Sequence, residues 1–217
     1  MCAIVGSFSP VRFVELMKLN MYRGSFSFSV TVMDNTLISN TSKSLGQFNS
    51  DIFFKDLPIS KSYYYLGHIQ APTGGLVKDI NRVHPAQVDS FKFLHNGIIK
   101  SKEVKRLQSE TSSGNKWDTY LMLYYLYQKR IENIGKTLSE IDGSFACALL
   151  KENDFFYIFR NPPGILFVDK ELTISSTKFK GSEILEENKI FSLDLINKRM
   201  NEIQTFTSKS DPYYLGE

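Results

Sequence analysis

The 217-residue chain has few cysteines, little net charge and no long hydrophobic run. Its two cysteines, Cys2 and Cys147, argue against a disulfide scaffold and for a reducing compartment. The formal net charge is only +3, with basic residues scattered, which indicates neither nucleic acid nor an anionic membrane as a partner. We find neither a signal peptide nor an apolar run of the roughly 18 residues that span a membrane. We therefore expect a cytoplasmic protein.

The length and composition favour one globular domain. Hydrophobic residues make up 42% of the chain and charged residues 23%, which is ordinary for a folded domain with a sizeable core. We expect the domain to cover residues 1–207 and a tail to cover residues 208–217. The tail is either a docking element for a partner or a frayed terminus.

Apolar periodicity predicts strands at both ends of the chain and helices in the middle. A helix is expected to begin at Pro10, with Val11, Val14, Met17 and, as a further candidate, Phe13 on one face. Residues 40–60 are expected to be loop with a short strand or helix. Strands are expected at residues 2–8, 26–32, 63–69, 91–94, 144–150, 155–159, 165–168, 172–175, 189–193 and 199–205. The strands at 144–150 and 155–159 are expected to form one hairpin, and those at 165–168 and 172–175 a second. Further helices are expected at 103–107, at 117–131 and near 181–186. Another helix is expected after 131 and to end at about residue 140. This order favours an α+β fold with mainly antiparallel sheets.

The N-terminus is the stretch whose residues most clearly indicate a chemical reaction. Residue 2 is small, so an aminopeptidase can remove Met1 and leave Cys2 with a free α-amine. An α-amine titrates near 7.7–8.0 and a thiol near 8.5, so the two groups form a self-contained nucleophile and base. The alternative is an ordinary buried strand in which Cys2 is a small hydrophobic residue.

Several other stretches pair a polar residue with a glycine at a strand end or begin the longest predicted helix. They are Tyr22-Arg23-Gly24, Gly67-His68-Ile69-Gln70, His95-Asn96-Gly97-Ile98 and Trp117-Asp118-Thr119. Together with Cys2, their order resembles the class II glutamine amidotransferase domain of the N-terminal-nucleophile hydrolase superfamily. Within this family, the chain resembles the glutaminase domain of glucosamine-6-phosphate synthase and its relatives. Later stretches extend the resemblance over most of the chain: Ile141 to Ala146, Arg160 to Gly164 and Ile174 to Ser176.

The resemblance implies a four-layer αββα sandwich of two mainly antiparallel sheets, and a reaction without a cofactor. Cys2 would attack the side-chain amide of glutamine while its α-amine carries the proton. The Asn96 side chain and the Gly97 N–H would stabilise the oxyanion. The alternative interpretation of Asn96-Gly97 is a type I′ hairpin turn, for which this dipeptide is the strongest signal.

The resemblance also implies residues that bind the substrate. Asp118 would hold its α-ammonium group, although an acidic residue there also suits a helix N-terminus. Arg23 would brace the loop around the nucleophile, or would be a solvated turn residue. Thr73 would contact the α-carboxylate.

Gln70 is the main departure from this family, which has an arginine there that pairs with the substrate α-carboxylate. Glutamine donates hydrogen bonds but carries no charge, and Arg82 is a candidate to supply the charge. Two alternatives therefore stay open. One is an N-terminal-nucleophile amidohydrolase for another amide or a γ-glutamyl compound, and the other is an inactive regulatory homologue.

The remaining candidates indicate no metal site and no nucleotide site. The spacing of His68, His84 and His95 fits no ligand motif, and Gly74-Gly75 lacks the context of a phosphate loop. Cys147 is expected in the core. We expect glutamine as the substrate and a separate synthase as the partner that uses the ammonia.

Overall fold

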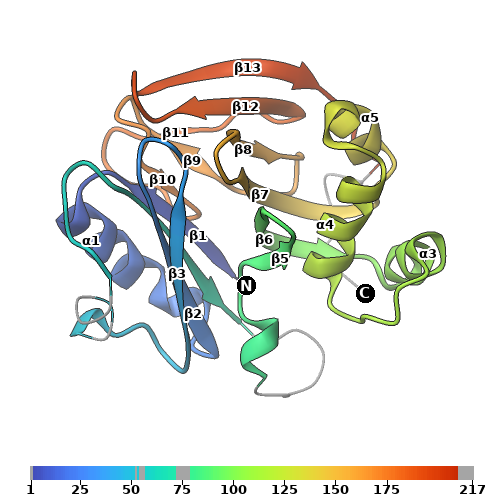
Figure 1. Cartoon of the computed structure of the whole chain (residues 1–217), viewed down its shortest axis with the longest axis horizontal. Helices are drawn as coiled ribbons and strands as arrows, with labels where there is room; N and C mark the ends of the chain where they lie inside the picture. The colour runs from blue at the N-terminus through green and yellow to red at the C-terminus, as the bar shows by residue number, and fades with distance from the viewer. Residues whose placement is uncertain (1, 52, 54–56, 72–78, 210–217) are drawn as a thin grey trace.

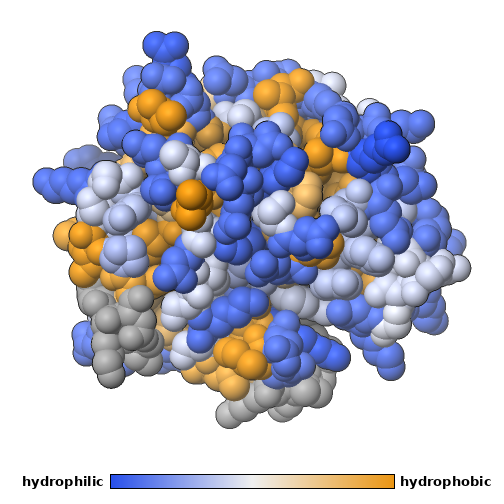
Figure 2. Space-filling view, in the orientation of Figure 1, coloured by the Kyte–Doolittle hydropathy of each residue, from blue (hydrophilic) through white to orange (hydrophobic). Residues whose placement is uncertain are grey.

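The computed structural model describes residues 2–51, 53, 57–71 and 79–209, and within them the chain forms two antiparallel sheets with helices on their outer faces (Figure 1). Among these residues, no helix has the length and apolar character required to cross a membrane. Polar side chains cover most of the face seen in Figure 2, where apolar ones form separate patches.

The first sheet has seven strands within the described residues, in the order β11-β9-β10-β1-β4-β2-β3. The bounds are β1 Ala3–Ser7, β2 Ser27–Met33, β3 Ser39–Leu45, β4 Tyr64–Gln70, β9 Phe167–Val168, β10 Ile174–Ser175 and β11 Glu183–Ile184. The second sheet has six, in the order β13-β12-β8-β7-β6-β5. The bounds are β5 Ala86–Val88, β6 Phe91–Ile99, β7 Gly143–Lys151, β8 Phe155–Arg160, β12 Lys189–Asp194 and β13 Arg199–Thr205.

The helices divide between the two outer faces. α1 (Pro10–Asn20) packs on the first sheet, whereas α3 (Ser101–Thr111), α4 (Asp118–Gln128) and α5 (Ile134–Ser139) lie over the second sheet (Figure 1). Short 3₁₀ helices connect elements: η1 (Met21–Arg23), η2 (Ile80–Arg82) and η3 (Ile131–Asn133). Ser9 caps α1 by accepting a hydrogen bond from the N–H of Arg12, and Pro10 occupies the first position of the helix.

Alternating side chains on the strands fill three separate cores. In β1, Ala3 and Val5 pack toward α1, whereas Ile4 packs between the sheets. In β6, Phe93 packs toward the helices and Leu94 between the sheets. Because helices cover the outer face of each sheet and the two inner faces pack together, the central strands are buried on both sides, and the fold is the expected αββα sandwich.

Most predicted elements are confirmed, including the hairpins β7–β8 and β9–β10 and the two last strands, β12 and β13, which pair with each other. The short strand expected among residues 40–60 is the edge strand β3, whose side chains are only partly buried. Two expectations are wrong. Residues 181–186 contain β11 rather than a helix, because their pairing with β9 overrides the weak helical pattern. Val11 is 67% exposed, whereas Phe13, Val14 and Met17 are buried as expected, and Leu16 joins them.

Candidate active site

Cys2 lies immediately before β1, at the end of the strand that pairs with β4. Its Sγ is 3.8 Å from the carbonyl oxygen of Ala71, the residue that follows β4. Arg23 Nε donates to the Cys2 carbonyl oxygen at 2.9 Å, so its guanidinium braces the backbone of the candidate nucleophile rather than pointing into solvent. Gly24, the next residue, packs closely against the end of β4, since a Cβ there would lie 2.5 Å from the carbonyl carbon of Gln70.

The environment of Cys2 keeps the thiol protonated near neutral pH. The residue keeps some solvent exposure, but the thiol is surrounded by protein, and this burial raises its pKa from 9.0 to about 11. The hydrogen bond to Ala71 and the charge of Arg23 act in the opposite direction, and the carboxylate of Asp118 adds to the rise. A nucleophilic role for this thiol therefore requires a nearby base.

Asn96 and Gly97 lie within β6, where they pair with Ala146 and Phe145 of β7. The hairpin-turn interpretation of this dipeptide is therefore wrong, because the strand continues to Ile99. Only glycine fits at position 97, since a Cβ would lie 1.9 Å from the carbonyl oxygen of Ser144. The backbone of β6 is thus held closely against β7 at this point.

Ser176, directly after β10, connects the two sheets beside these residues. Its Oγ accepts from the N–H of Ile4 at 3.0 Å and from Nδ2 of Asn96 at 3.1 Å. Its own N–H donates to the carbonyl oxygen of Ile4 at 3.0 Å. The strand that follows Cys2 and the side chain of Asn96 are therefore joined through one buried hydroxyl.

The three histidines of the chain gather near the start of α4, and all are buried. His68 and His84 stack with ring centroids 3.6 Å apart. His68 Nε2 contacts the carbonyl oxygen of His95 at 3.0 Å, which links β4 to β6 across the sheets. Thr119 Oγ1 lies 3.1 Å from His84 Nε2 and 3.4 Å from His95 Nδ1.

Two of these histidines, His68 and His84, are kept neutral by their burial. Burial lowers the pKa of His68 to about 3, and it lowers the pKa of His84 well below its usual range. His95 Nε2 faces the carbonyl oxygen of Ser144 at 3.2 Å. Within the described part of the chain, no group of three or more His, Cys, Asp or Glu residues is arranged to hold a metal ion.

Asp118 is the first residue of α4. Its Oδ1 accepts from the N–H of Thr119 at 2.7 Å, and its Oδ2 is 4.0 Å from His95 Nδ1. The carboxylate also acts electrostatically on the Cys2 thiol. Its position therefore suits both interpretations, a charge at a helix N-terminus and a group that faces the space next to Cys2.

Gln70, at the end of β4, has its side-chain amide held at both ends. Ser27 Oγ donates to its Oε1 at 2.7 Å, and its Nε2 donates to the carbonyl oxygen of Arg82 at 3.2 Å. Sequence reasoning missed Ser27 because the alternation around it predicts a half-buried strand, whereas β2 is buried throughout. The amide leaves at most one N–H for a ligand.

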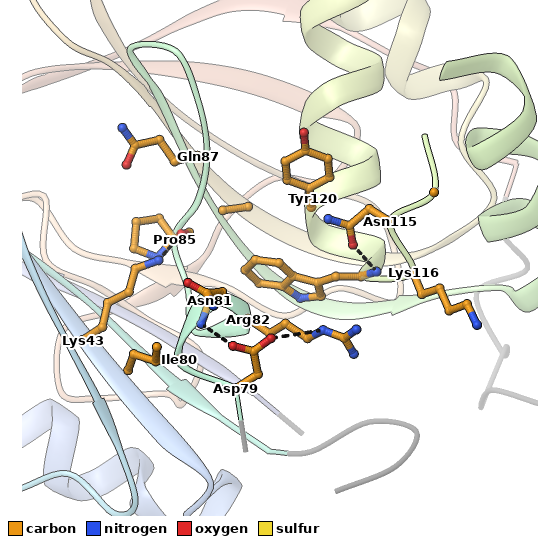
Figure 3. A pocket seen from close by; sticks show the side chains of 13 residues that line it. Lys43, Asp79, Ile80, Asn81, Arg82, Pro85, Gln87, Asn115, Lys116 and Tyr120 are labelled. Carbon is orange, nitrogen blue, oxygen red and sulfur yellow. Dashed lines mark hydrogen bonds and ion pairs between the residues drawn. The ribbon is translucent and has the colours of Figure 1, made fainter. Parts of the chain in front are cut away.

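The Arg82 side chain is directed toward Asp79, with 3.9 Å between Nε and Oδ2 (Figure 3). It is 46% exposed and lines a cleft of about 730 Å³ between η2, β5 and the start of α4. Neither Cys2 nor Asn96 is among the described residues that line this cleft. In the described contacts, Arg82 thus contributes its backbone carbonyl to Gln70, and its guanidinium stays with Asp79.

Some predictions lie outside the described residues. These are the removal of Met1, the role of Thr73, the Gly74-Gly75 pair and almost all of the expected tail. The proposed boundary at residue 207 stays a prediction. Cys147 is confirmed as a core residue, fully buried beneath the helices of the second sheet.

Comparison with known proteins relates this fold to amidotransferases. No family model matches the sequence, and no curated protein matches it. Among solved structures, glutamine phosphoribosylpyrophosphate amidotransferase from B. subtilis, complexed with ADP and GMP, aligns with a TM-score of 0.70 at 15% identity. A structure described as the allosteric regulatory enzyme of purine biosynthesis aligns with a TM-score of 0.70 at 13% identity.

Both alignments cover 95% of this chain and 49% of the other, so the chain spans about half the length of these proteins. The chain therefore shares its fold with about half of each of these proteins. The finer resemblance to glucosamine-6-phosphate synthase stays a prediction.

Proposed function

We propose that this protein hydrolyses the side-chain amide of glutamine to glutamate and ammonia, with Cys2 as the nucleophile. The observation that carries the proposal is the position of Cys2 directly before β1, a strand whose Ile4 is joined through Ser176 to Asn96 on the facing sheet. This arrangement combines a thiol with donors for an oxyanion in a fold of the amidotransferase type.

In the proposed reaction, the Cys2 sulfur attacks the amide carbon and its proton passes to the α-amine that removal of Met1 exposes. The negative oxygen of the tetrahedral intermediate accepts hydrogen bonds from Asn96 Nδ2 and from the N–H of Gly97. The intermediate then expels ammonia, which takes the proton back from the α-ammonium, and a thioester remains. Water hydrolyses the thioester and releases glutamate. The raised pKa of the thiol explains why such a base is needed.

Asp118 holds the substrate α-ammonium in this proposal, and Thr73 and Gln70 contact its carboxylate. The ammonia passes to a separate synthase, because free ammonia is mostly protonated at neutral pH and is lost to solvent. The resemblance to amidotransferases supports such a partner.

Two variants with the same chemical change test the nucleophile. Cys2→Ala still permits removal of Met1 and should reduce glutamate release by at least about 10³-fold. Cys147→Ala removes the other thiol, which is buried in the core, and should keep the activity. Intact mass should show that the purified protein lacks Met1, and that a glutamine-mimicking diazoketone labels the wild type and Cys147→Ala only. A retained Met1, or labelling of Cys2→Ala, would contradict the proposal.

One observation favours a second candidate, an amidohydrolase for another amide or a γ-glutamyl compound. The Gln70 amide is neutral and is already bonded to Ser27 and Arg82, so it provides no charge for a free α-carboxylate. Comparing glutamine with amide-capped and γ-glutamyl substrates separates the two candidates. The second candidate predicts a larger kcat/KM for substrates that lack a free α-carboxylate than for glutamine. A folded wild type from which Met1 is removed, but which turns over none of them, would point to the inactive regulatory homologue instead.

A further inference from the structure

We propose that Ser176 is a positioning residue that sets the distance between the nucleophile strand and the oxyanion donor, an inference that rests on the proposed function. Ser176 itself contacts neither the Cys2 thiol nor a reacting atom in this assignment. It acts through Ile4 and Asn96, to which its hydroxyl is hydrogen-bonded.

The need for such a residue follows from the architecture. Cys2 precedes β1 of the first sheet, whereas Asn96 lies in β6 of the second sheet. Most of the contact between the sheets is apolar, with side chains such as Ile4 and Leu94. Apolar packing has no preferred direction, so it allows small lateral shifts, whereas a hydrogen bond constrains both distance and angle.

The contacts of Ser176 are suited to this task. Its backbone N–H and its hydroxyl both bind the backbone of Ile4, two residues after Cys2. The same hydroxyl accepts one N–H of the Asn96 amide, which has two such donors and keeps the other for a ligand. Ser176 is 1% exposed, so water cannot replace it without rearrangement.

We expect the loss of the Ser176 hydroxyl to slow the chemical step rather than to weaken substrate binding. Oxyanion donors act only when they lie within hydrogen-bonding distance of the developing charge, and a shift of about 1 Å can cost on the order of 10²-fold in rate. We therefore expect Ser176→Ala to lower kcat by roughly 10- to 100-fold with little change in KM.

Ser175→Ala is the matched control. Ser175 is the preceding residue and is also buried, and its Oγ likewise accepts two hydrogen bonds, from Asn20 Nδ2 at 2.9 Å and from the N–H of Thr177 at 3.1 Å. The substitution removes the same atoms but leaves Asn96 untouched. We expect it to keep kcat within about 2-fold of the wild type while costing a similar amount of stability.

The rate of Cys2 alkylation separates a loss of oxyanion positioning from a general loss of structure, because a general loss of structure would change both alkylation and amide hydrolysis. Iodoacetamide reacts with the Cys2 thiol without forming an oxyanion, so Ser176→Ala should be alkylated at the wild-type rate although its amide hydrolysis is slow. Equal losses in both reactions would overturn the positioning role, as would a kcat equal to that of Ser175→Ala.

Nuclear magnetic resonance tests the inference without depending on glutaminase activity. The side-chain NH₂ signals of Asn96 can be assigned from their disappearance in Asn96→Ala. One of these protons should be protected from exchange in the wild type and in Ser175→Ala, and should lose that protection in Ser176→Ala. If the wild type releases no glutamate, the proposed function fails but this measurement still decides the role of Ser176. Unchanged protection in Ser176→Ala would refute it.

Discussion

The strands β4 and β6 both bring polar residues to the candidate site, but they hold them in different ways. Asn96 and Gly97 lie inside β6, with pairing to β7 on both sides of them in the sequence. Gln70 is the last residue of β4, and its side chain depends on hydrogen bonds to Ser27 and Arg82. The expected oxyanion donors are thus positioned by backbone pairing, whereas the expected recognition residue is positioned by side chains at a strand end.

This difference explains where the sequence departs from the family it resembles. A substitution at Gly97 would separate two paired strands, so the structure tolerates no other residue there. A substitution at position 70 changes only side-chain contacts. The expected recognition residue at position 70 can therefore change, while Asn96 and Gly97 keep the geometry of the expected oxyanion donors.

Gly97→Ala should produce the largest effect and tests the rigid half of this comparison. Its Cβ would lie 1.9 Å from the carbonyl oxygen of Ser144, a backbone atom that cannot rotate away. We expect a loss of about 3 kcal/mol or more in the free energy of unfolding, at or above the usual range for overpacking.

Urea unfolding measures this loss, and Gly114→Ala is the control, because a Cβ there meets no atom within 4 Å. Gly114→Ala should stay within about 0.5 kcal/mol of the wild type. A Gly97→Ala protein of near wild-type stability would show that β6 is not held as rigidly as we argue.

The lowered pKa values of the buried His68 and His84 predict a smaller effect, which is a loss of stability at mildly acid pH. The folded-state pKa of His68 is about 3 and that of His84 is also lowered, whereas an unfolded histidine titrates near 6.5. Below about pH 6.5 the unfolded state thus binds protons that the folded state does not. The contribution of His68 to stability is complete above this pH and falls as the pH decreases, by about 1.4 kcal/mol between pH 7.5 and pH 5.5, and the lowered pKa of His84 acts in the same direction.

Urea unfolding at the two pH values measures this difference. His68→Gln removes one titrating group and keeps an amide N–H that can reach the carbonyl oxygen of His95. We expect the pH-dependent loss to become smaller in this variant by the share of one histidine. The same loss in the wild type and the variant would show that His68 is protonated in the folded protein.

Gln70→Arg should have the smallest effect and tests the adaptable half of the comparison. An arginine at the end of β4 supplies the charge for a substrate α-carboxylate, so KM for glutamine should fall by about 10-fold, a typical value for one charge-assisted contact. Steady-state kinetics measures the change, and Gln70→Lys is the control, because it adds charge without a planar fork. An unchanged or higher KM in both variants would mean that the substrate carboxylate does not bind at position 70.

Much of the fold follows from local patterns in the sequence. Local sequence patterns predict the hairpins β7–β8 and β9–β10, and Pro10 predicts the start of α1. The expectation failed where pairing outweighed local preference, as in β11, and local pattern did not give the length of the polar edge strand β3. Such choices depend on neighbours that are distant in the chain.

The candidate site divides in the same way. The sequence by itself determined Cys2 near the N-terminus, the Asn96-Gly97 pair, Asp118 at a helix start and a glutamine at position 70, because these depend on residue type and local order. Only the tertiary structure decided that Asn96 lies within a strand, that Ser176 joins it to β1, and that Ser27 and Arg82 hold Gln70. The physical reason is that each of these contacts joins segments brought together only when the two sheets form and pack, and a short-range pattern carries no information about that packing.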